Sequence, residues 1–234
     1  MTTGKKVQWV GMLAPMQPEL QPIVRQLGME GDGTLYRGRA GNVDVIATLT
    51  TMGMTQGEQA AERVLDMGVD WVMVVGIAGG VDRGIMIGDV IVPEVVLDRR
   101  TGKTYRPTPI GDIAPRGIFS TGDDLVTDPD TLAAWGTEGV VAVEMESGGV
   151  GVVCERAGVP WSVFRGISDM AADGLVDQDM FAMTNPDGTA DHDAITRYLE
   201  EHPEKIPVLT QLAHDTDIAT EAAAAAAIRA CMTF

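Results

Sequence analysis

The chain has 234 residues, of which 45% are hydrophobic and 22% are charged, as in an ordinary soluble domain. This length suits one well-buried domain, residues 1–234, better than two. With a net charge of −17, the chain would be repelled by phosphate backbones and by anionic lipid, so we expect neither a nucleic-acid partner nor a membrane partner.

Cysteine and histidine usage argues against a disulfide framework and against a metal site. The two cysteines are Cys154 and Cys231, and the three histidines all fall in the last quarter of the chain. No signal peptide or transmembrane segment is recognisable. We therefore expect a cytoplasmic protein that needs no metal or other cofactor.

Apolar runs and turn residues predict strands that alternate with helices. The expected strands cover residues 7–13, 33–38, 43–49, 71–75, 89–97, 117–120, 140–143 and 159–167. The expected helices cover residues 18–27, 56–67, 130–135, 147–157, 194–201, 206–214 and 218–230. This alternation indicates an α/β domain with a central sheet. The remaining long segments are a polar loop at 98–116, a lid-like insertion at 173–206 that opens with an acidic loop, and C-terminal helices at 207–234.

A glycine-rich run, Gly76 to Gly80, follows the expected strand at 71–75. A dinucleotide-binding motif would need a helix directly after the glycines, because the pyrophosphate binds at the helix N-terminus. Here a new strand follows, and this disfavours a dinucleotide site. The glycines either form a tight turn or let a flat ligand lie against the backbone, and the sequence leaves both alternatives open.

Carboxylates follow two of the apolar runs. Glu144 and Glu146 follow the run 139–143, and Asp169 comes shortly after the run 159–164. In open α/β sheets the ligand crevice lies beyond the carboxyl ends of the strands. Acidic groups that meet there can hold hydroxyl groups and deliver a proton, so we predict an enzyme.

Six short motifs occur in a recognisable order. They are G-M-L-A-P-M-Q-P-E, G-I-A-G-G, G-D-V-I-V-P, T-G-D, V-E-M-E-S and R-G-I-S-D. In this order they resemble the nucleoside phosphorylase/nucleosidase superfamily, and the chain looks most like the methylthioadenosine/S-adenosylhomocysteine nucleosidases from about residue 7 to residue 172. The resemblance implies a three-layer α/β/α sandwich around a twisted mixed sheet. It also implies hydrolysis of a 5'-modified adenosine, such as methylthioadenosine or S-adenosylhomocysteine.

The resemblance further implies roles for individual residues. Asp169 would protonate the purine at N7, Glu19 would activate the attacking water, and Glu146 would bind the ribose hydroxyls. The other residues that would support or contact the substrate are Met145 and Met54 near the ribose, Ser168 beside Asp169, Leu125 against the base, and Glu144, Ala78 and Gly79.

Hydrolysis of an N-glycosidic bond requires two carboxyl groups. Cleavage of an N-glycosidic bond builds an oxocarbenium-like sugar and an anionic purine, so one acid must protonate the purine while a second carboxylate handles the water. Asp169 can be that acid near neutral pH only if burial or a neighbouring negative charge raises its pKa. Arg165 would lower this pKa if its side chain shared the site, and the sequence leaves its orientation open.

The nucleophile decides between hydrolysis and phosphorolysis. A phosphorylase needs arginines at the nucleophile site, because phosphate is anionic. Residues 11–20 contain Glu19 and no arginine, and the arginine nearest to residues 76–80 is Arg83. We therefore predict hydrolysis, with phosphorolysis as the alternative. Two readings from other classes remain: a relative that binds a purine nucleoside without cleaving it, and a scaffold protein whose oligomer is the product.

The chain departs from the nucleosidases in three places. Ile77 stands where many relatives have a small polar residue. The segment 89–121 is shorter than the segment that builds the dimer contact and part of the 5'-substituent pocket in those relatives, which puts both properties in doubt. We still expect a homo-oligomer, with a dimer favoured. The segment 172–206 is longer, and we expect it to control substrate access.

Overall fold

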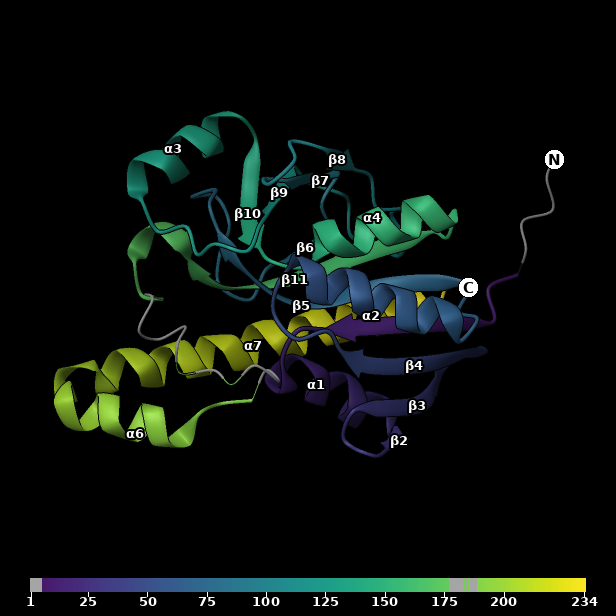
Figure 1. The fold of residues 1–234 in the computed structure, drawn as a ribbon, viewed down its shortest axis with the longest axis horizontal. Coiled ribbons are helices and arrows are strands. Elements are labelled where there is room, and N and C mark those ends of the chain that lie inside the picture. Colours follow the sequence, from purple (N-terminus) through teal and green to yellow (C-terminus); the bar gives the residue numbers. More distant parts are fainter. Residues whose placement is uncertain (1–5, 177–182, 184, 186–188) are drawn as a thin grey trace.

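A mixed sheet runs through the molecule (Figure 1). The computed structural model describes residues 6–176, 183, 185 and 189–234. The described strands form an 11-stranded sheet in the order β2-β3-β4-β1-β5-β10-β9-β7-β8, and β11 pairs with β5 and β6. The strands are β1 Trp9–Ala14, β2 Glu30–Gly31, β3 Leu35–Ala40, β4 Val43–Leu49, β5 Trp71–Gly80, β6 Val90–Ile91, β7 Val95–Asp98, β8 Thr104–Tyr105, β9 Ile118–Thr121, β10 Val140–Glu144 and β11 Trp161–Met170.

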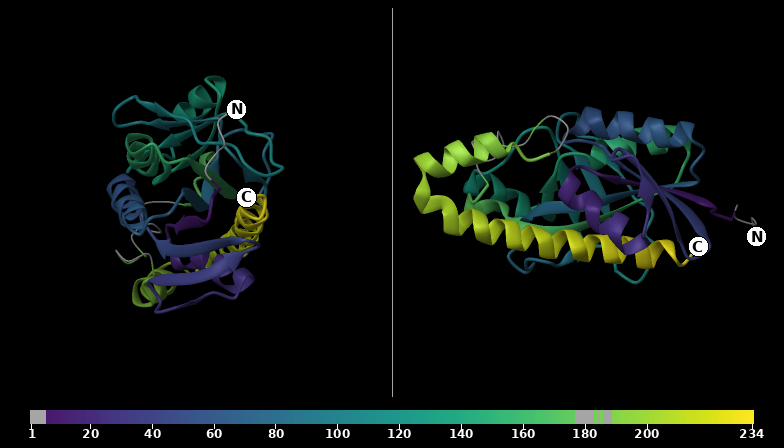
Figure 2. Two further views of the ribbon diagram at one scale, coloured as in Figure 1. Left: turned by 90° about the vertical axis from the view of Figure 1, so that its right-hand side faces the viewer. Right: turned by 90° about the horizontal axis from the view of Figure 1, so that it is seen from below.

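Helices cover both faces of the sheet (Figure 2). Helices α1 and α7 share one hydrophobic core with the sheet, and α2 and α4 share the other. This confirms the three-layer α/β/α sandwich around a mixed sheet. The helices are α1 Gln17–Leu27, α2 Met54–Asp66, α3 Pro129–Thr137, α4 Ser147–Ala157, α6 His192–Glu201 and α7 Ile206–Cys231, with short 3-10 helices η1 Ala171–Asp173 and η2 Pro203–Lys205.

Strand β5 is longer than the sequence predicts. It continues through the glycine run to Gly80 and does not end at Val75, so the alternative of a tight turn was wrong. The glycines stay in the sheet because β11 pairs with the whole run and β10 pairs with Gly79 and Gly80. In the register, Gly79 faces Val143 of β10 on one side and Asp169 of β11 on the other. The end of β5 therefore lies between two strands that carry predicted site residues.

Strand β11 also continues past its predicted end, to Met170. Its register against β5 shifts between Ile167 and Asp169, which leaves Ser168 as an extra residue. A bulge of this kind interrupts the alternation of side chains between the two faces of a sheet. Arg165 and Asp169 therefore cannot be assigned to one face by counting residues.

Two predicted boundaries between residues 89 and 116 were also wrong. The expected strand 89–97 is split into β6 and β7, with Pro93 between them, since proline has no N–H to donate to a sheet ladder. The expected polar loop 98–116 contains β8, which pairs with β7.

The two C-terminal helices expected at 206–214 and 218–230 are one helix, α7. The polar residues His214 to Asp217 did not end it, because they are exposed or half-buried and need no partner from the core. The second half of α7 lies directly on β11. A Cβ atom at Gly166 would stand 2.1 Å from the carbonyl oxygen of Ala219, so only glycine permits this approach.

The first turns of α7 project beyond the sheet, with α6 alongside (Figures 1 and 2). Both belong to the region predicted to form a lid and C-terminal helices. Residues 177–182, 184 and 186–188 of the acidic loop lie outside the described residues, so the role of this segment in access stays a prediction. In the part of the chain that is described, no helix has the length and apolar character needed to cross a bilayer.

Candidate active site

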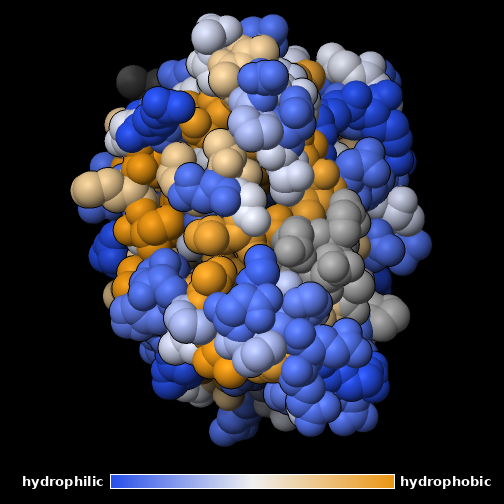
Figure 3. Space-filling view, turned by 90° about the vertical axis from the view of Figure 1, so that its left-hand side faces the viewer, coloured by the Kyte–Doolittle hydropathy of each residue, from blue (hydrophilic) through white to orange (hydrophobic). Residues whose placement is uncertain are grey.

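A cavity of about 300 Å³ lies at the carboxyl ends of β5, β10 and β11. The loop after β9 and the first half of α7 complete its wall. On the side of the molecule where β11 ends, Figure 3 shows apolar side chains gathered in the middle of the face and ringed by hydrophilic ones. All but one of the predicted site residues line the cavity: Glu19, Ala78, Gly79, Leu125, Glu144, Met145, Glu146, Ser168 and Asp169.

The exception is Met54, the first residue of α2. Its side chain is fully buried, and a Cβ atom at Gly148 would meet its sulfur and terminal methyl at about 3 Å, so it packs against the start of α4. Met52, two residues earlier, lines the cavity in its place.

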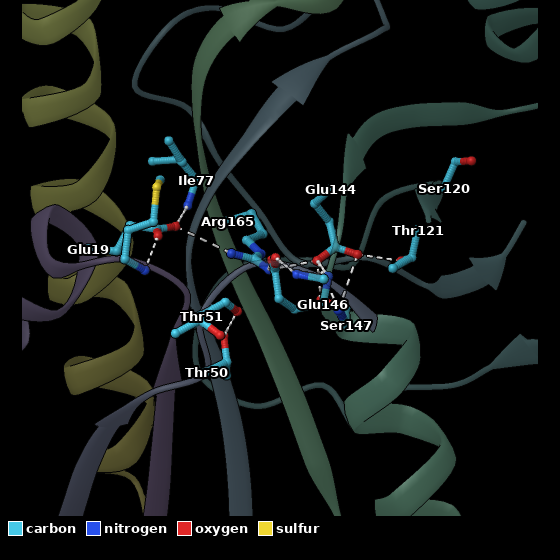
Figure 4. Close-up of polar contacts among 12 residues, drawn as sticks. Glu19, Thr50, Thr51, Ile77, Ser120, Thr121, Glu144, Glu146, Ser147 and Arg165 are labelled. Carbon is cyan, nitrogen blue, oxygen red and sulfur yellow. Dashed lines mark hydrogen bonds and ion pairs between the residues drawn. The ribbon is translucent and has the colours of Figure 1, made fainter. Parts of the chain in front are cut away.

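Arg165 is the centre of a buried ionic cluster (Figure 4). Its guanidinium lies 2.6 Å from a carboxylate oxygen of Glu144, 2.8 Å from one of Glu146 and 3.5 Å from one of Glu19. All four side chains are at least 96% buried. One cation thus faces three carboxyl groups, more than its single charge can balance if all three are ionised.

Glu144 is committed to this cluster. Its carboxylate accepts hydrogen bonds from the Thr121 hydroxyl, from the Ser147 hydroxyl and N–H, and from the Glu146 N–H, in addition to Arg165. Burial by itself would raise the Glu144 pKa, but Arg165 and these donors leave it below its usual range. We infer that Glu144 holds Arg165 in place and lines the cavity without a free oxygen for substrate.

Glu146 keeps more capacity for a ligand. Its Oε1 accepts the Gly53 N–H at 2.9 Å, and its Oε2 accepts from Arg165 at 2.8 Å. Burial raises the Glu146 pKa to about 7, against the lowering effect of Arg165 and together with the nearby charge of Glu144. Each oxygen has a lone pair left for a hydroxyl group.

Glu19 is fixed at the start of α1. Its Oε2 accepts the Met16 N–H at 2.8 Å, and its Oε1 accepts the Ile77 N–H at 2.8 Å. The first of these bonds satisfies a backbone donor that a helix start leaves open. Burial raises the Glu19 pKa to about 8, although Arg165 and the two backbone donors act in the opposite direction.

These shifts predict how stability depends on pH. The folded state binds the Glu19 proton more tightly than the unfolded chain, in which the pKa is 4.5. Between about pH 4.5 and 8 the free energy of unfolding therefore falls as pH rises, by up to about 1.4 kcal/mol per pH unit for one proton. Glu19→Gln removes this group, so its Tm should fall less between pH 5 and 8 than the wild-type Tm.

The control for this measurement is Glu62→Gln, which alters an exposed carboxylate paired with Arg156. Its Tm should follow the wild-type curve across the same pH range. A Glu19→Gln curve parallel to the wild type would contradict a proton held at Glu19.

Asp169 stands apart from the cluster, on the far side of the bulge in β11. Its Oδ1 accepts the Ser168 hydroxyl at 2.7 Å. Burial raises the Asp169 pKa, the Ser168 hydrogen bond lowers it, and the charge of Asp173 raises it further, with a net shift upward. This is the direction that a general acid working near neutral pH requires.

Several lining residues were missed in the sequence. Arg99 and Asp124 bring charge to the cavity wall, and no motif pointed to them. The ionic cluster around Arg165 could have been inferred from the sequence. Arg165 is the single charged residue within the apolar run 159–167, and a buried cation there has to meet carboxylates. The other cavity residues outside the prediction are Pro15, Met16, Ile77, Val126, Thr127, Val143, Ala171, Val176, Leu212 and Thr216.

The cavity offers acid-base groups and hydroxyl acceptors rather than metal ligands. Among the described residues, no group of three or more His, Cys, Asp or Glu side chains has the arrangement of a metal site. Asp169 has the geometry to protonate a leaving group, and Glu146 has oxygen lone pairs to bind hydroxyl groups.

Comparison with known proteins supports the same chemistry. A sequence model of the Phosphorylase superfamily matches residues 10–115 and 111–201. The 5'-methylthioadenosine/S-adenosylhomocysteine nucleosidase of Tolumonas auensis is 27% identical over 198 residues, which cover 69% of this chain and 86% of the relative. The aminodeoxyfutalosine nucleosidase of Helicobacter pylori is 25% identical over 200 residues, which cover 70% and 87%.

A solved structure shows the same fold. The S-adenosylhomocysteine nucleosidase from Streptococcus pyogenes, in complex with 5-methylthiotubericidin, superposes with a TM-score of 0.73. The match covers 99% of both chains at 19% sequence identity. The order of layers and strands is therefore shared even where few residues are.

Proposed function

Because the chain belongs to the phosphorylase superfamily, we propose that it is a nucleosidase that hydrolyses the N-glycosidic bond of a purine nucleoside and releases the base. One observation carries the proposal: Asp169, suited to protonate a leaving base, and Glu19, suited to act on water, line the same cavity. The names of the curated relatives support a 5'-modified adenosine, such as methylthioadenosine or S-adenosylhomocysteine, as the substrate.

In this proposal Asp169 is the general acid. The upward shift of its pKa favours the protonated carboxyl group, which gives its proton to N7 of the purine as the bond between C1' and N9 breaks. Ser168 orients the carboxyl group through its hydrogen bond. The electron pair of the broken bond leaves with the purine, which departs as a neutral base.

The carboxylates on the other side of the cavity serve the sugar and the water. Glu146 accepts hydrogen bonds from the ribose hydroxyls, and Met145 lies against the sugar. Glu19 and Glu146 act in their ionised forms, which the positive charge that develops on the ribose stabilises in the transition state. Glu19 then takes a proton from the water whose oxygen bonds to C1'.

Water suits this site better than phosphate. Arg165 does lie 3.5 Å from Glu19, although residues 11–20 contain no arginine. Its guanidinium is, however, already engaged by Glu144 at 2.6 Å and by Glu146 at 2.8 Å. A phosphate at Glu19 would have to displace one of these carboxylates, whereas water needs only a hydrogen-bond acceptor.

The test is chromatographic detection of free base from a panel of nucleosides, each with and without phosphate. The panel contains methylthioadenosine, S-adenosylhomocysteine, 5'-deoxyadenosine, adenosine, inosine and guanosine. We expect release of adenine from the 5'-modified adenosines at the same rate in both conditions. Release that requires phosphate would make the protein a phosphorylase, and binding of the nucleosides without release would make it an inactive relative.

Two further expectations belong to this proposal. A homo-oligomer, with a dimer favoured, stays a prediction that light scattering on the purified protein would test. A cytoplasmic location is likewise a prediction from the sequence, and fractionation of cells that express the protein would test it.

A further inference from the structure

Arg99 follows β7 and sits in the cavity wall, far in sequence from the acid-base residues. It contacts the end of β9 and the loop 121–127 that continues from it through three backbone carbonyls. Its N–H donates to the Thr121 carbonyl at 2.9 Å, and its guanidinium donates to the carbonyls of Ser120 at 2.9 Å and of Asp124 at 2.8 Å. One residue thus anchors both ends of the turn that precedes Leu125.

The guanidinium of Arg99 packs against two other segments. It lies over the ring of Trp135 in α3, with its central carbon 5.6 Å from the ring centroid. A Cβ atom at Gly122 would stand only 2.6 to 2.7 Å from its atoms, so the backbone of the loop also rests on it directly. A planar group held in this way has few alternative conformations.

The loop is also linked to the ribose side of the cavity. The Asp123 carboxylate accepts the Met54 N–H at 2.7 Å, and the neighbouring Gly53 N–H donates to Glu146 at 2.9 Å. The Gly122 N–H donates to the Glu144 carbonyl at 3.2 Å. The loop therefore has fixed contacts to the residues around Glu146, and Arg99 supplies a second, separate set.

A direct role for Arg99 in binding an anionic ligand is disfavoured by charge. Its guanidinium donates to backbone carbonyls, and its charge already interacts with nearby carboxylates, of which that of Glu144 acts most strongly. An anion in the cavity would also meet the acidic side chains that line it. The cavity-lining acids are Glu19, Asp124, Glu144, Glu146 and Asp169.

We propose that Arg99 is a positioning residue that holds the loop 121–127 so that Leu125 and Val126 form the base side of the cavity. This inference rests on the proposed function, because it takes the ligand of these residues to be a purine. The charged hydrogen bonds to two carbonyls fix the loop before substrate arrives, so binding does not have to order it.

The test compares Arg99→Met, Arg99→Lys and the control Arg100→Met. Arg100 is the next residue and also an arginine, but its exposed side chain pairs with Glu58 and Asp98. With methylthioadenosine as substrate, Arg99→Met should raise KM by roughly 10- to 100-fold and leave kcat within about threefold of the wild type. Inhibition by free adenine should weaken by the same factor, while inhibition by 5-methylthioribose should not change.

Arg99→Lys should recover only part of the adenine affinity, because an ammonium group keeps the charge but lacks the planar fork that spans the carbonyls of Ser120 and Asp124. Arg100→Met should match the wild type in every measurement. The proposal is overturned if adenine and methylthioribose weaken equally, which would indicate general disorder, or if Arg99→Met leaves KM unchanged.

Failure of the proposed function would be seen separately. If the wild type releases no base, calorimetric titration of the same variants with adenine and with methylthioribose still measures the two sides of the cavity. If the wild type cleaves the nucleoside, and Arg99→Met and Arg100→Met lose the same amount of adenine affinity, only the positioning role is overturned. A wild type that binds no adenine would overturn it as well.

Discussion

Asp169→Asn should lower kcat for base release by about 100-fold or more, the usual scale for loss of a general acid. Asparagine has nearly the same shape and can still hydrogen-bond to N7, but it has no proton to transfer. KM should therefore change little. Because the Asp169 pKa is already raised by burial, a neutral amide should also fold at least as well as the acid. The measurement is free base released at saturating nucleoside, with Tm recorded for the same preparations.

Asp173→Asn is the matched control, four residues further along the chain. The charge of Asp173 raises the Asp169 pKa, so its removal should lower that pKa and move the loss of activity at high pH to a lower pH. The maximal rate should stay close to that of the wild type. An Asp169→Asn enzyme with kcat within threefold of the wild type would show that another group supplies the proton.

Arg165→Met should reduce the free energy of unfolding by about 3–5 kcal/mol at pH 7.5, the scale for removing one member of a buried ionic cluster. Methionine fills a similar volume, but Glu19, Glu144 and Glu146 would lose their common counter-charge. The loss should be smaller at pH 5, where the carboxylates can bind protons instead. Urea denaturation of the wild type and the variant at both pH values gives the two differences.

Two further variants keep this prediction testable. Arg156→Met removes an exposed arginine that pairs with Glu62 and should cost less than about 1 kcal/mol at either pH. If Arg165→Met does not fold at pH 7.5, Arg165→Lys should fold, because it retains the charge. Equal losses for Arg156→Met and Arg165→Met would contradict the central place of Arg165 in the cluster.

Much of the fold followed from local patterns. Strand β4 and helix α4 have the predicted bounds, because a clear apolar pattern ends at a turn residue or at a cap in both. The errors came from pairing between distant segments. Gly76 to Gly80 looks like a turn when taken alone, and it is a strand because β10 and β11 hydrogen-bond to it. Local sequence does not carry that information.

The site residues also fall into those that local sequence predicts and those that depend on distant contacts. Residues within compact motifs, such as Glu146 and Asp169, could be placed from the sequence because their strands bring them to one edge of the sheet. The prediction of Met54 missed by two residues, because the methionine that lines the cavity is Met52. Arg99 could not be found, because its role depends on a loop more than twenty residues away and on the absence of a side chain at Gly122.

The continuity of α7 limits how this cavity can vary. Leu212 and Thr216 line the cavity from one end of the helix, while residues from Ala219 onward are locked against β11 at Gly166. One residue inserted between Thr216 and Ala219 would turn the whole first half by about 100° and carry both side chains out of the wall. Insertions in the turn between α6 and α7 would leave both side chains in the wall. The length of that turn is thus free to diverge between relatives, whereas the spacing inside α7 is not.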